Sequence, residues 1–280
     1  MFIEKSDLVL NSSHRRKPIA IDARWVFDGK NHPVVIFVHG VKGYKDWGTF
    51  NLIADYFAAN GFAFVKMNLS HNGTTLRNPT DFADLDAFGE NNFSIELDDI
   101  AVLIDHLFGP HCLIPFLDLD NVTLIGHSRG GALSILKSAQ DRRITKTVSW
   151  APIPSVEHLF RNIDLEQWKE DGVFYIENSR THQQMPLKWQ IMEDYFENQQ
   201  ALDVNEAASQ LKKLLLIFGT KDLAIPINAA QEFIEQHPHA QTMIVEDGEH
   251  TFGGKEPYTE DSLPLDTWRI VERTIGFIQG

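Results

Sequence analysis

The sequence Gly-His-Ser-Arg-Gly at 126–130 places a serine between two glycines. The apolar run 122–125 precedes it, and a helical pattern follows at 131–139. A strand, a sharp turn and a helix in this order expose the central hydroxyl above the end of a sheet. Glycines suit the turn because larger side chains there collide with the neighbouring strand and helix. Ser128 is therefore a candidate nucleophile, favoured over an incidental serine in a glycine-rich turn.

A serine nucleophile needs a base and an acid that orients the base, and in this arrangement the acid precedes the base along the chain. Asp222 follows the apolar run 214–218, and His250 follows the run 242–245. The carboxyl ends of parallel strands share one edge of the sheet, so both side chains are expected near Ser128. Of the 12 histidines, His250 is the one that follows a strand in this order. Asp247 is the rival acid, disfavoured because it lies so near His250 in sequence.

The loop His-Gly-Val-Lys-Gly at 39–43 directly follows the apolar run 34–38. Acyl transfer requires two backbone N–H groups aimed at the oxygen that becomes negative. We expect one from Arg129, the residue after the serine, and the other from Val41. For His39 we favour a role in bracing the loop over one as a base. His39 and Gly40 are also candidate substrate contacts.

The elements that would position these residues alternate along the chain. Short β-branched runs predict strands, and amphipathic stretches between them predict helices. The predicted strands are 19–26, 34–38, 63–68, 122–125, 147–150, 214–218 and 242–245. The predicted helices are 50–59, 95–107, 132–139, 229–236 and 265–277. This alternation predicts an α/β fold with a mostly parallel central sheet flanked by helices.

Residues 151–210 interrupt the alternation without a central strand, and they are too many for an ordinary loop. We expect an inserted cap over the active site, with a β-hairpin from 173–177 and 181–185 and helices at 156–169 and 187–198. Residues 1–150 and 211–280 then form the core domain. The candidate substrate-contacting aromatics are Trp47 in the early loop and Phe174, Tyr175 and Trp189 in the cap. Packing is the favoured role for each of them.

The amino-acid composition disfavours several kinds of partner and site. Lys and Arg total 25 and Asp and Glu total 39, a formal net charge of −14. Such a charge disfavours nucleic acid and anionic membranes as partners. The single cysteine, Cys112, cannot form an internal disulfide. Without a secretory pattern or a long apolar run, the protein is expected to be soluble and cytoplasmic. His111 and Cys112 lack the further ligands of a metal site.

The loop at 39–40, the serine motif at 126–130, Asp222 and the run 250–252 together resemble the α/β-hydrolase superfamily. Within it, the chain is similar to small bacterial cinnamoyl and feruloyl esterases, and to dienelactone-hydrolase-like and acylaminoacyl-peptidase-like enzymes. The resemblance runs from about residue 19 to the C-terminus. In the loop 68–74, Asn72 stands where the family often has glycine. The resemblance implies no metal and no organic cofactor, and a hairpin-containing insertion over the site.

The hypothesis is a serine hydrolase that cleaves small-molecule carboxylic esters with small or aromatic acyl groups, through an acyl-enzyme intermediate. The same residues could cleave an amide, peptide or thioester bond. A non-catalytic binding protein is the alternative of a different class, because a fold does not fix a function. The oligomeric state stays open, a homodimer included.

Overall fold

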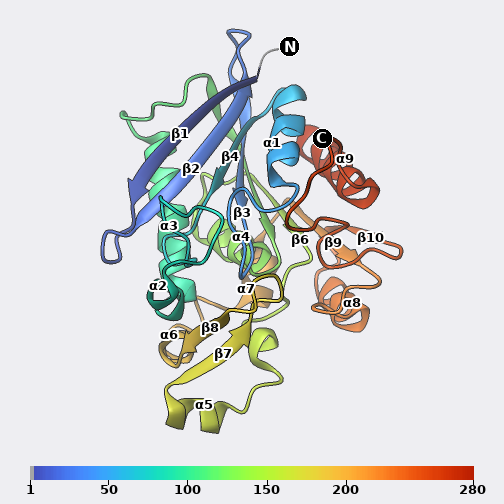
Figure 1. Ribbon diagram of the computed structural model, residues 1–280. Helices are drawn as coiled ribbons and strands as arrows, with labels where there is room; N and C mark the ends of the chain where they lie inside the picture. The colour runs from blue at the N-terminus through green and yellow to red at the C-terminus, as the bar shows by residue number, and fades with distance from the viewer. Residues whose placement is uncertain (1–2) are drawn as a thin grey trace.

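The computed structural model describes residues 3–280, which contain an eight-stranded sheet in the order β1-β2-β4-β3-β5-β6-β9-β10 (Figure 1). The strands are β1 (Ile3–Asn11), β2 (Pro18–Val26), β3 (His32–Val38), β4 (Ala63–Met67), β5 (Leu117–His127), β6 (Lys146–Trp150), β9 (Leu214–Gly219) and β10 (Gln241–Val245). β1 and β2 pair antiparallel, as do β2 and β4, and the strands from β4 to β10 pair parallel. The predicted mostly parallel α/β sheet is confirmed.

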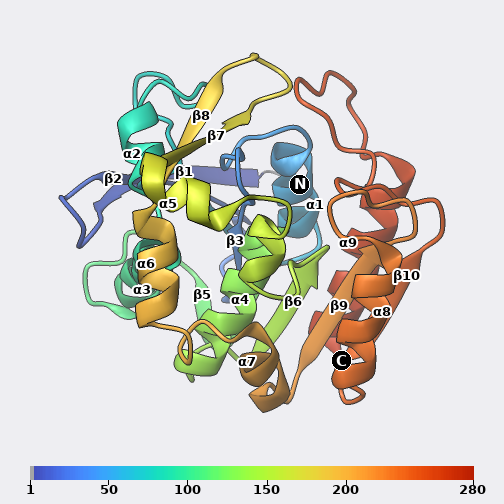
Figure 2. The same ribbon diagram turned by 90° about the horizontal axis from the view of Figure 1, so that it is seen from below.

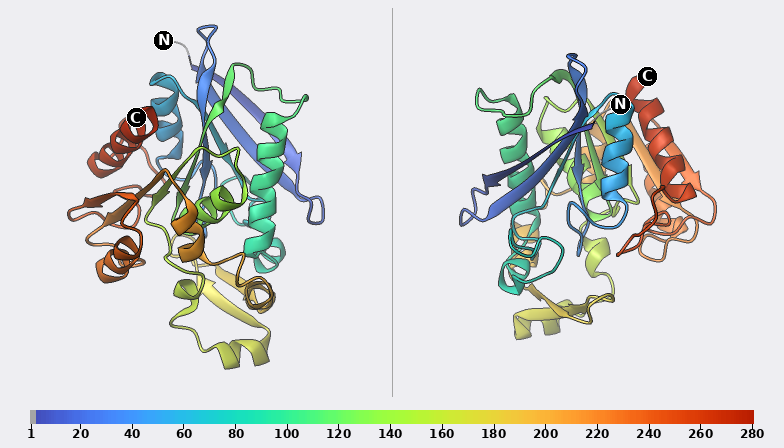
Figure 3. Two further views of the ribbon diagram at one scale, coloured as in Figure 1. Left: turned by 180° about the vertical axis from the view of Figure 1, so that it is seen from behind. Right: turned by 45° about the horizontal axis from the view of Figure 1, so that its top comes forward.

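Helices cover both faces of the sheet. On one face lie α1 (Phe50–Ala59) and α9 (Leu265–Gln279), whose apolar sides share a core with the sheet. On the other lie α3 (Phe93–Phe108), α4 (Arg129–Gln140) and α8 (Ile227–Gln236), packed in a second core. Both views in Figure 3 show α1 and α9 on one side and α3 on the other. The two cores bury both faces of the central strands, which explains their continuous apolar runs.

The chain between β6 and β9 folds outside the sheet. It forms the 3₁₀ helix η1 (Glu157–Phe160), α5 (Leu165–Asp171), the antiparallel hairpin of β7 (Val173–Glu177) and β8 (Gln184–Lys188), α6 (Gln190–Glu197) and α7 (Val204–Gln210). Figure 2 looks onto the face where α5, α6 and the hairpin lie. Buried Met185 of β8 packs with Tyr44 and Phe82, and with α2 (Leu85–Gly89) through Phe88. This apolar cluster fixes the hairpin against the loop that follows β3.

Most of the predicted elements match the structure, with differences at the edge and in the insertion. β1 was missing from the prediction, because its exposed positions alternate and its sequence mixes charged with apolar residues. The predicted helix at 156–169 is instead η1 and α5, separated by Asp164, whose side chain accepts hydrogen bonds from the first turn of α5. The predicted helix at 187–198 begins only at Gln190, because β8 continues to Lys188.

Strand register brings the candidate residues to one edge of the sheet. Val38 at the end of β3 pairs with Gly126 of β5, and Val245 at the end of β10 pairs with Gly219 of β9. The loops that follow these four strands carry Val41, Ser128, Asp222 and His250. Ligands of parallel α/β sheets bind at this carboxyl edge.

Candidate active site

Ser128 lies at the turn between β5 and α4 with φ 58° and ψ −121°, a conformation that non-glycine residues rarely adopt. The turn is tight, since a Cβ on Gly126 would lie 1.9 Å from the carbonyl oxygen of Gly130. The glycines of the motif are therefore required by the close approach of backbone to backbone. Strained backbone of this kind is found where the surrounding structure holds a functional side chain in place.

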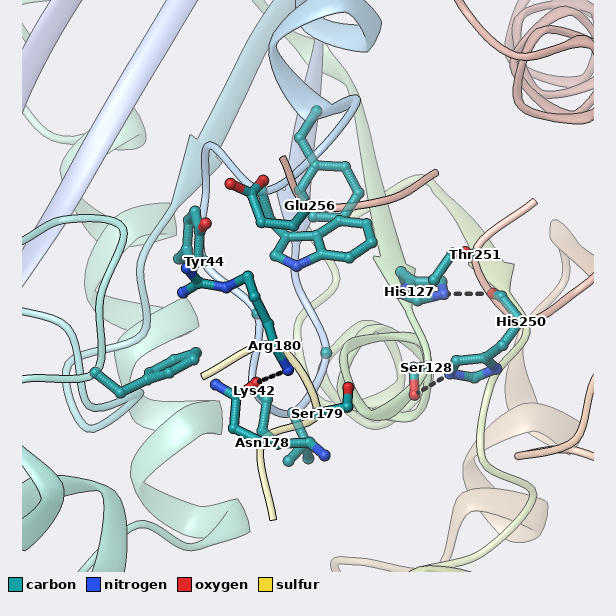
Figure 4. A pocket seen from close by; sticks show the side chains of 16 residues that line it. Lys42, Tyr44, His127, Ser128, Asn178, Ser179, Arg180, His250, Thr251 and Glu256 are labelled. Atoms are coloured by element: carbon teal, nitrogen blue, oxygen red, sulfur yellow. Dashed lines mark hydrogen bonds between the residues drawn. The ribbon is translucent and has the colours of Figure 1, made fainter. Parts of the chain in front are cut away.

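Two consecutive hydrogen bonds connect Ser128 to His250 and His250 to Asp222. Nε2 of His250 lies 2.9 Å from Oγ of Ser128, and Nδ1 lies 2.7 Å from Oδ2 of Asp222 (Figure 4 shows the first pair). A carboxylate only accepts, so Nδ1 carries the proton and Nε2 is left to accept from the serine hydroxyl. This tautomer is the one that a general base requires.

Asp222 is held as a buried carboxylate. Its side chain is 0% exposed, and Oδ1 accepts the amides of Ala224 and Ile225, each at 2.8 Å. Burial works to raise the pKa of Asp222. The hydrogen bond from His250 and the two amides outweigh burial, so the pKa lies below its usual value. The rival Asp247 pairs instead with Lys221 at 3.0 Å, and its side chain is 68% exposed.

His127 holds the segment that carries His250. Its Nε2 lies 2.8 Å from the carbonyl oxygen of His250, to which it must donate, and the two rings lie 4.9 Å apart (Figure 4). Burial lowers the pKa of His127 to about 3. The neutral ring can keep this tautomer at physiological pH, so it braces the backbone of the base without adding a charge beside it.

The two candidate oxyanion amides come from the loop after β3 and from the residue that follows Ser128. The loop after β3 approaches closely, since a Cβ on Gly40 would lie 3.0 Å from Cβ of Ser128. Within residues 3–280, the amides of Val41 and Arg129 donate no hydrogen bond to a backbone carbonyl. His39 is 2% exposed and braces this loop, with Nδ1 2.9 Å from the carbonyl oxygen of Gly40. Burial lowers the pKa of His39 to about 4.

The side chain of Arg129 anchors the first turn of α4. Its Nε donates to Oε2 of Glu96 at 2.6 Å, and its guanidinium lies 4.0 Å from the centre of the Phe93 ring. Both partners of the ion pair are almost fully buried. Burial raises the pKa of Glu96 despite the adjacent Arg129. The pair ties α4 to α3 directly behind Ser128.

Ser128 and His250 open into a cavity of about 380 Å³ (Figure 4). Its apolar walls include Trp47, Phe50 and Phe82. The hairpin turn between β7 and β8 also lines the cavity, through residues 178–180. The site is thus a pocket between the sheet edge, the loop after β3 and the inserted hairpin.

The predicted substrate contacts divide into two groups. Gly40 and Trp47 line this cavity, whereas His39, Phe174, Tyr175 and Trp189 are not among its lining residues. Phe174 and Trp189 instead pack against Trp168, with ring centres 6.0 and 5.6 Å away. Tyr175 is 53% exposed. Two of these aromatics therefore pack the insertion, and the third lies on its surface.

Several lining residues were missed by the sequence analysis. They are Lys42, Tyr44, Phe50, Phe82, Asn178, Ser179, Arg180, Thr251 and Glu256. Proximity to Val41 and to the predicted hairpin turn could have suggested Lys42 and Arg180. Nothing in the sequence indicated Glu256, which reaches the cavity from the loop after His250.

A family model described as "Alpha/beta hydrolase family" matches residues 35–257. This match covers most of the chain, including the parallel strands from β3 to β10, the insertion and the three hydrogen-bonded residues, so the chain belongs to the alpha/beta hydrolase family. A search of curated protein sequences gave no match. No helix within residues 3–280 combines the length and apolar character that crossing a bilayer requires.

Solved structures show the same fold. Est1E from Butyrivibrio proteoclasticus, in a structure described as having ferulic acid bound, has a TM-score of 0.71 and 16% identity over 98% of this chain and 100% of its own. A putative dienelactone hydrolase from Klebsiella pneumoniae has a TM-score of 0.62 and 14% identity over 100% and 99%. An acylaminoacyl peptidase from Pyrococcus horikoshii has a TM-score of 0.68 and 17% identity, covering 100% of this chain and 42% of its own. At these identities the likeness shows the fold alone.

Proposed function

We propose that this protein is a serine hydrolase that cleaves carboxylic esters through an acyl-enzyme intermediate. The observation that carries the proposal is the pair of hydrogen bonds that connects Ser128, His250 and Asp222, with Ser128 in strained backbone and lining a cavity. Each member has the partner that its role requires, and the three come from loops after three different strands.

In the first step, Nε2 of His250 takes the proton of Ser128 as Oγ attacks the ester carbonyl carbon. The oxyanion that forms is held by the amides of Val41 and Arg129. Buried Asp222 stabilises the imidazolium that develops at His250. His250 then gives its proton to the leaving alkoxide. Water, activated by the same histidine, releases the acid and restores Ser128.

The substrate is a small ester whose acyl group is small or aromatic. The volume of about 380 Å³ suits a ligand of this size, and the walls formed by Trp47, Phe50 and Phe82 suit an aromatic ring. The structural neighbour Est1E, described with ferulic acid bound, agrees with this choice. Residues 151–210 act as a cap, since the hairpin turn closes one side of the cavity.

A fluorophosphonate probe tests the serine directly. The intact protein should be labelled at Ser128 with one probe per chain, and the Ser128→Ala variant should not be labelled. Matched 4-nitrophenyl and methyl hydroxycinnamate esters, compared with the corresponding anilides, then decide between ester and amide cleavage. Absence of labelling and of turnover on every substrate would favour a binding protein and refute the proposal.

A further inference from the structure

The end of the cavity remote from His250 carries two cationic side chains. Lys42 comes from the loop after β3 and Arg180 from the hairpin turn, and both line the same cavity as Ser128. Figure 4 shows Lys42, Arg180 and Tyr44 grouped at one end, with Ser128 and His250 at the other.

Lys42 lacks a carboxylate partner. Its Nζ donates to the carbonyl oxygen of Glu177 at 3.0 Å, and no carboxylate of residues 3–280 lies within 4 Å of it. The carboxylate of Glu177 lies against His182 instead, at 2.7 Å. Burial lowers the pKa of Lys42, with the charge of Glu177 only partly opposing it. The ammonium keeps two N–H donors that no described residue occupies.

Arg180 and Tyr44 also carry hydrogen-bond donors that no described residue occupies at normal distance. Nη2 of Arg180 donates to the carbonyl oxygen of Thr80 at 3.1 Å and to Oδ1 of Asp81 at 3.3 Å. The Asp81 side chain is 65% exposed, and a pair of this kind is weak. Tyr44 is 1% exposed, and its hydroxyl has no hydrogen-bond partner at normal distance within residues 3–280. Burial and the nearby Glu256 carboxylate raise its pKa, so the hydroxyl stays protonated. An unpaired buried hydroxyl is costly unless a ligand completes it.

One lining residue opposes an anion. Glu256 lies on the wall of this cavity, and its Oε2 accepts the amide of Gly48 at 2.6 Å. Its charge balances one of the two cations. Counted over the lining side chains alone, the two cations outnumber Glu256 by one charge, and Asp81 outside the cavity offsets part of the Arg180 charge. Hydrogen-bond donors remain available on both cations.

We propose that this end of the cavity binds a carboxylate that the substrate carries remote from its scissile ester bond. The proposal rests on the proposed function, because it takes Ser128 as the nucleophile at the other end. The carboxylate oxygens accept hydrogen bonds from Lys42 and Arg180 and from the Tyr44 hydroxyl. Hydrogen bonds between charged groups are stronger than neutral ones, so charge becomes a determinant of specificity. Lys42, Arg180 and Tyr44 would then bind the substrate without taking part in the reaction at Ser128.

Two matched series of esters test the proposal. In the acid-side series, mono-4-nitrophenyl esters of adipate to suberate are compared with the same esters bearing a terminal primary amide. These chain lengths limit attack of the carboxylate on its own ester. In the alcohol-side series, acetates of 3-(4-hydroxyphenyl)propanoate and of its propanamide are compared. We expect kcat/KM to be roughly tenfold higher for the charged member in one series, which also identifies the half of the substrate that carries the carboxylate.

Variants connect the preference to the named side chains. Lys42→Met and Arg180→Gln should each lower the ratio of charged to neutral kcat/KM several-fold, whereas Lys42→Arg should retain it. Glu256→Gln should raise the ratio, because it removes the opposing charge. Lys30→Met, in an exposed loop outside the cavity, is the matched control and should leave the ratio as in the unmodified protein. Thermal unfolding checks that each variant is folded.

Binding separates the two proposals. The Ser128→Ala variant, which cannot form the acyl-enzyme, is titrated by calorimetry with the intact charged ester and its amide, and the charged ester should bind roughly tenfold tighter. If Ser128 is labelled and neutral esters are hydrolysed, but both series and the titration show ratios near one, the carboxylate site is refuted and the hydrolase stands. If labelling and turnover fail, the proposed function fails, and the same titration still decides the carboxylate site.

Discussion

Replacing Asp222 by Asn changes one atom type inside a fixed set of hydrogen bonds. The amides of Ala224 and Ile225 both donate to Oδ1, so the amide oxygen of the new side chain must face them. Its NH₂ group then faces Nδ1 of His250, which must accept instead of donate. The proton moves to Nε2, and the ring can no longer take the proton of Ser128.

The magnitude follows from charge and geometry. The carboxylate lies 2.7 Å from Nδ1, its charge centre is about 4 Å from that of the imidazolium, and it is 0% exposed. At an effective dielectric constant of about 20, this attraction is worth about 4 kcal/mol in the transition state, or roughly 10³-fold in rate. The wrong tautomer adds to the loss. We expect kcat to fall by about 10³- to 10⁴-fold, a size also seen for the equivalent change in a serine protease.

The assay is kcat/KM on a 4-nitrophenyl ester across pH, with Asp247→Asn as the matched control. Asp247 is exposed, and Lys221 is the one cation that its carboxylate pairs with among residues 3–280, so its variant should keep activity within about twofold. The acid limb, which is the fall of kcat/KM at low pH, should move to lower pH in Asp222→Asn, because the charge that favours the imidazolium is gone. Residual activity above a tenth of wild type, a larger loss in Asp247→Asn, or a limb that moves upward would refute the role of Asp222.

Three further predictions concern the nucleophile, acid stability and the buried ion pair. Ser128→Ala should lower kcat by 10⁴-fold or more while the unfolding midpoint stays close to wild type; near-normal turnover would exclude Ser128 as nucleophile. His39 and His127 have folded pKa values of about 4 and 3, below the unfolded value of about 6.5, so the unfolded chain binds more protons between these limits. The free energy of unfolding should therefore keep this contribution above about pH 6.5 and lose it as the pH falls toward 4. Urea midpoints that stay constant from pH 7.5 to 5 would contradict this. Arg129→Met should lower the free energy of unfolding by about 3–5 kcal/mol, because Glu96 stays buried with the Asn91 amide as a donor but without its charge partner. Adding Glu96→Gln should recover part of this loss, and an additive double variant would show that the two side chains are uncoupled.

The sheet could be predicted from sequence because its central strands are buried on both faces. Continuous apolar runs such as 34–38 and 214–218 leave few other interpretations. The edge strand β1 could not be identified in this way, since only alternate residues are partly covered and its sequence resembles a polar loop. In the insertion the helices are shorter than predicted. Capping of α5 by Asp164 divides the predicted helix at 156–169, where periodicity alone does not, and β8 delays the start of α6.

Ser128, His250 and Asp222 could be predicted because each lies in the loop or turn that follows a strand, and the ends of parallel strands share one edge of the sheet. The rest of the pocket wall depends on tertiary contacts between loops, which leave no pattern along the chain. Tyr44, Arg180 and Glu256 are separated by more than seventy residues from each other and meet only in the folded protein. The aromatic residues of the insertion were candidates for the pocket, with packing as the favoured role, and in the structure Phe174 and Trp189 pack against Trp168.

The hairpin turn at 178–180 lines the cavity but lies on a different structural unit from the reacting residues, and laboratory evolution can use this separation. The reacting residues are fixed by the register of the sheet, whereas the turn belongs to a separate hairpin whose strands pair with each other alone. Residues of the turn can therefore be randomised without altering the geometry at Ser128, provided that buried Met185 keeps the hairpin seated. Libraries built at this turn would sample new substrate preferences while the chemical step is retained.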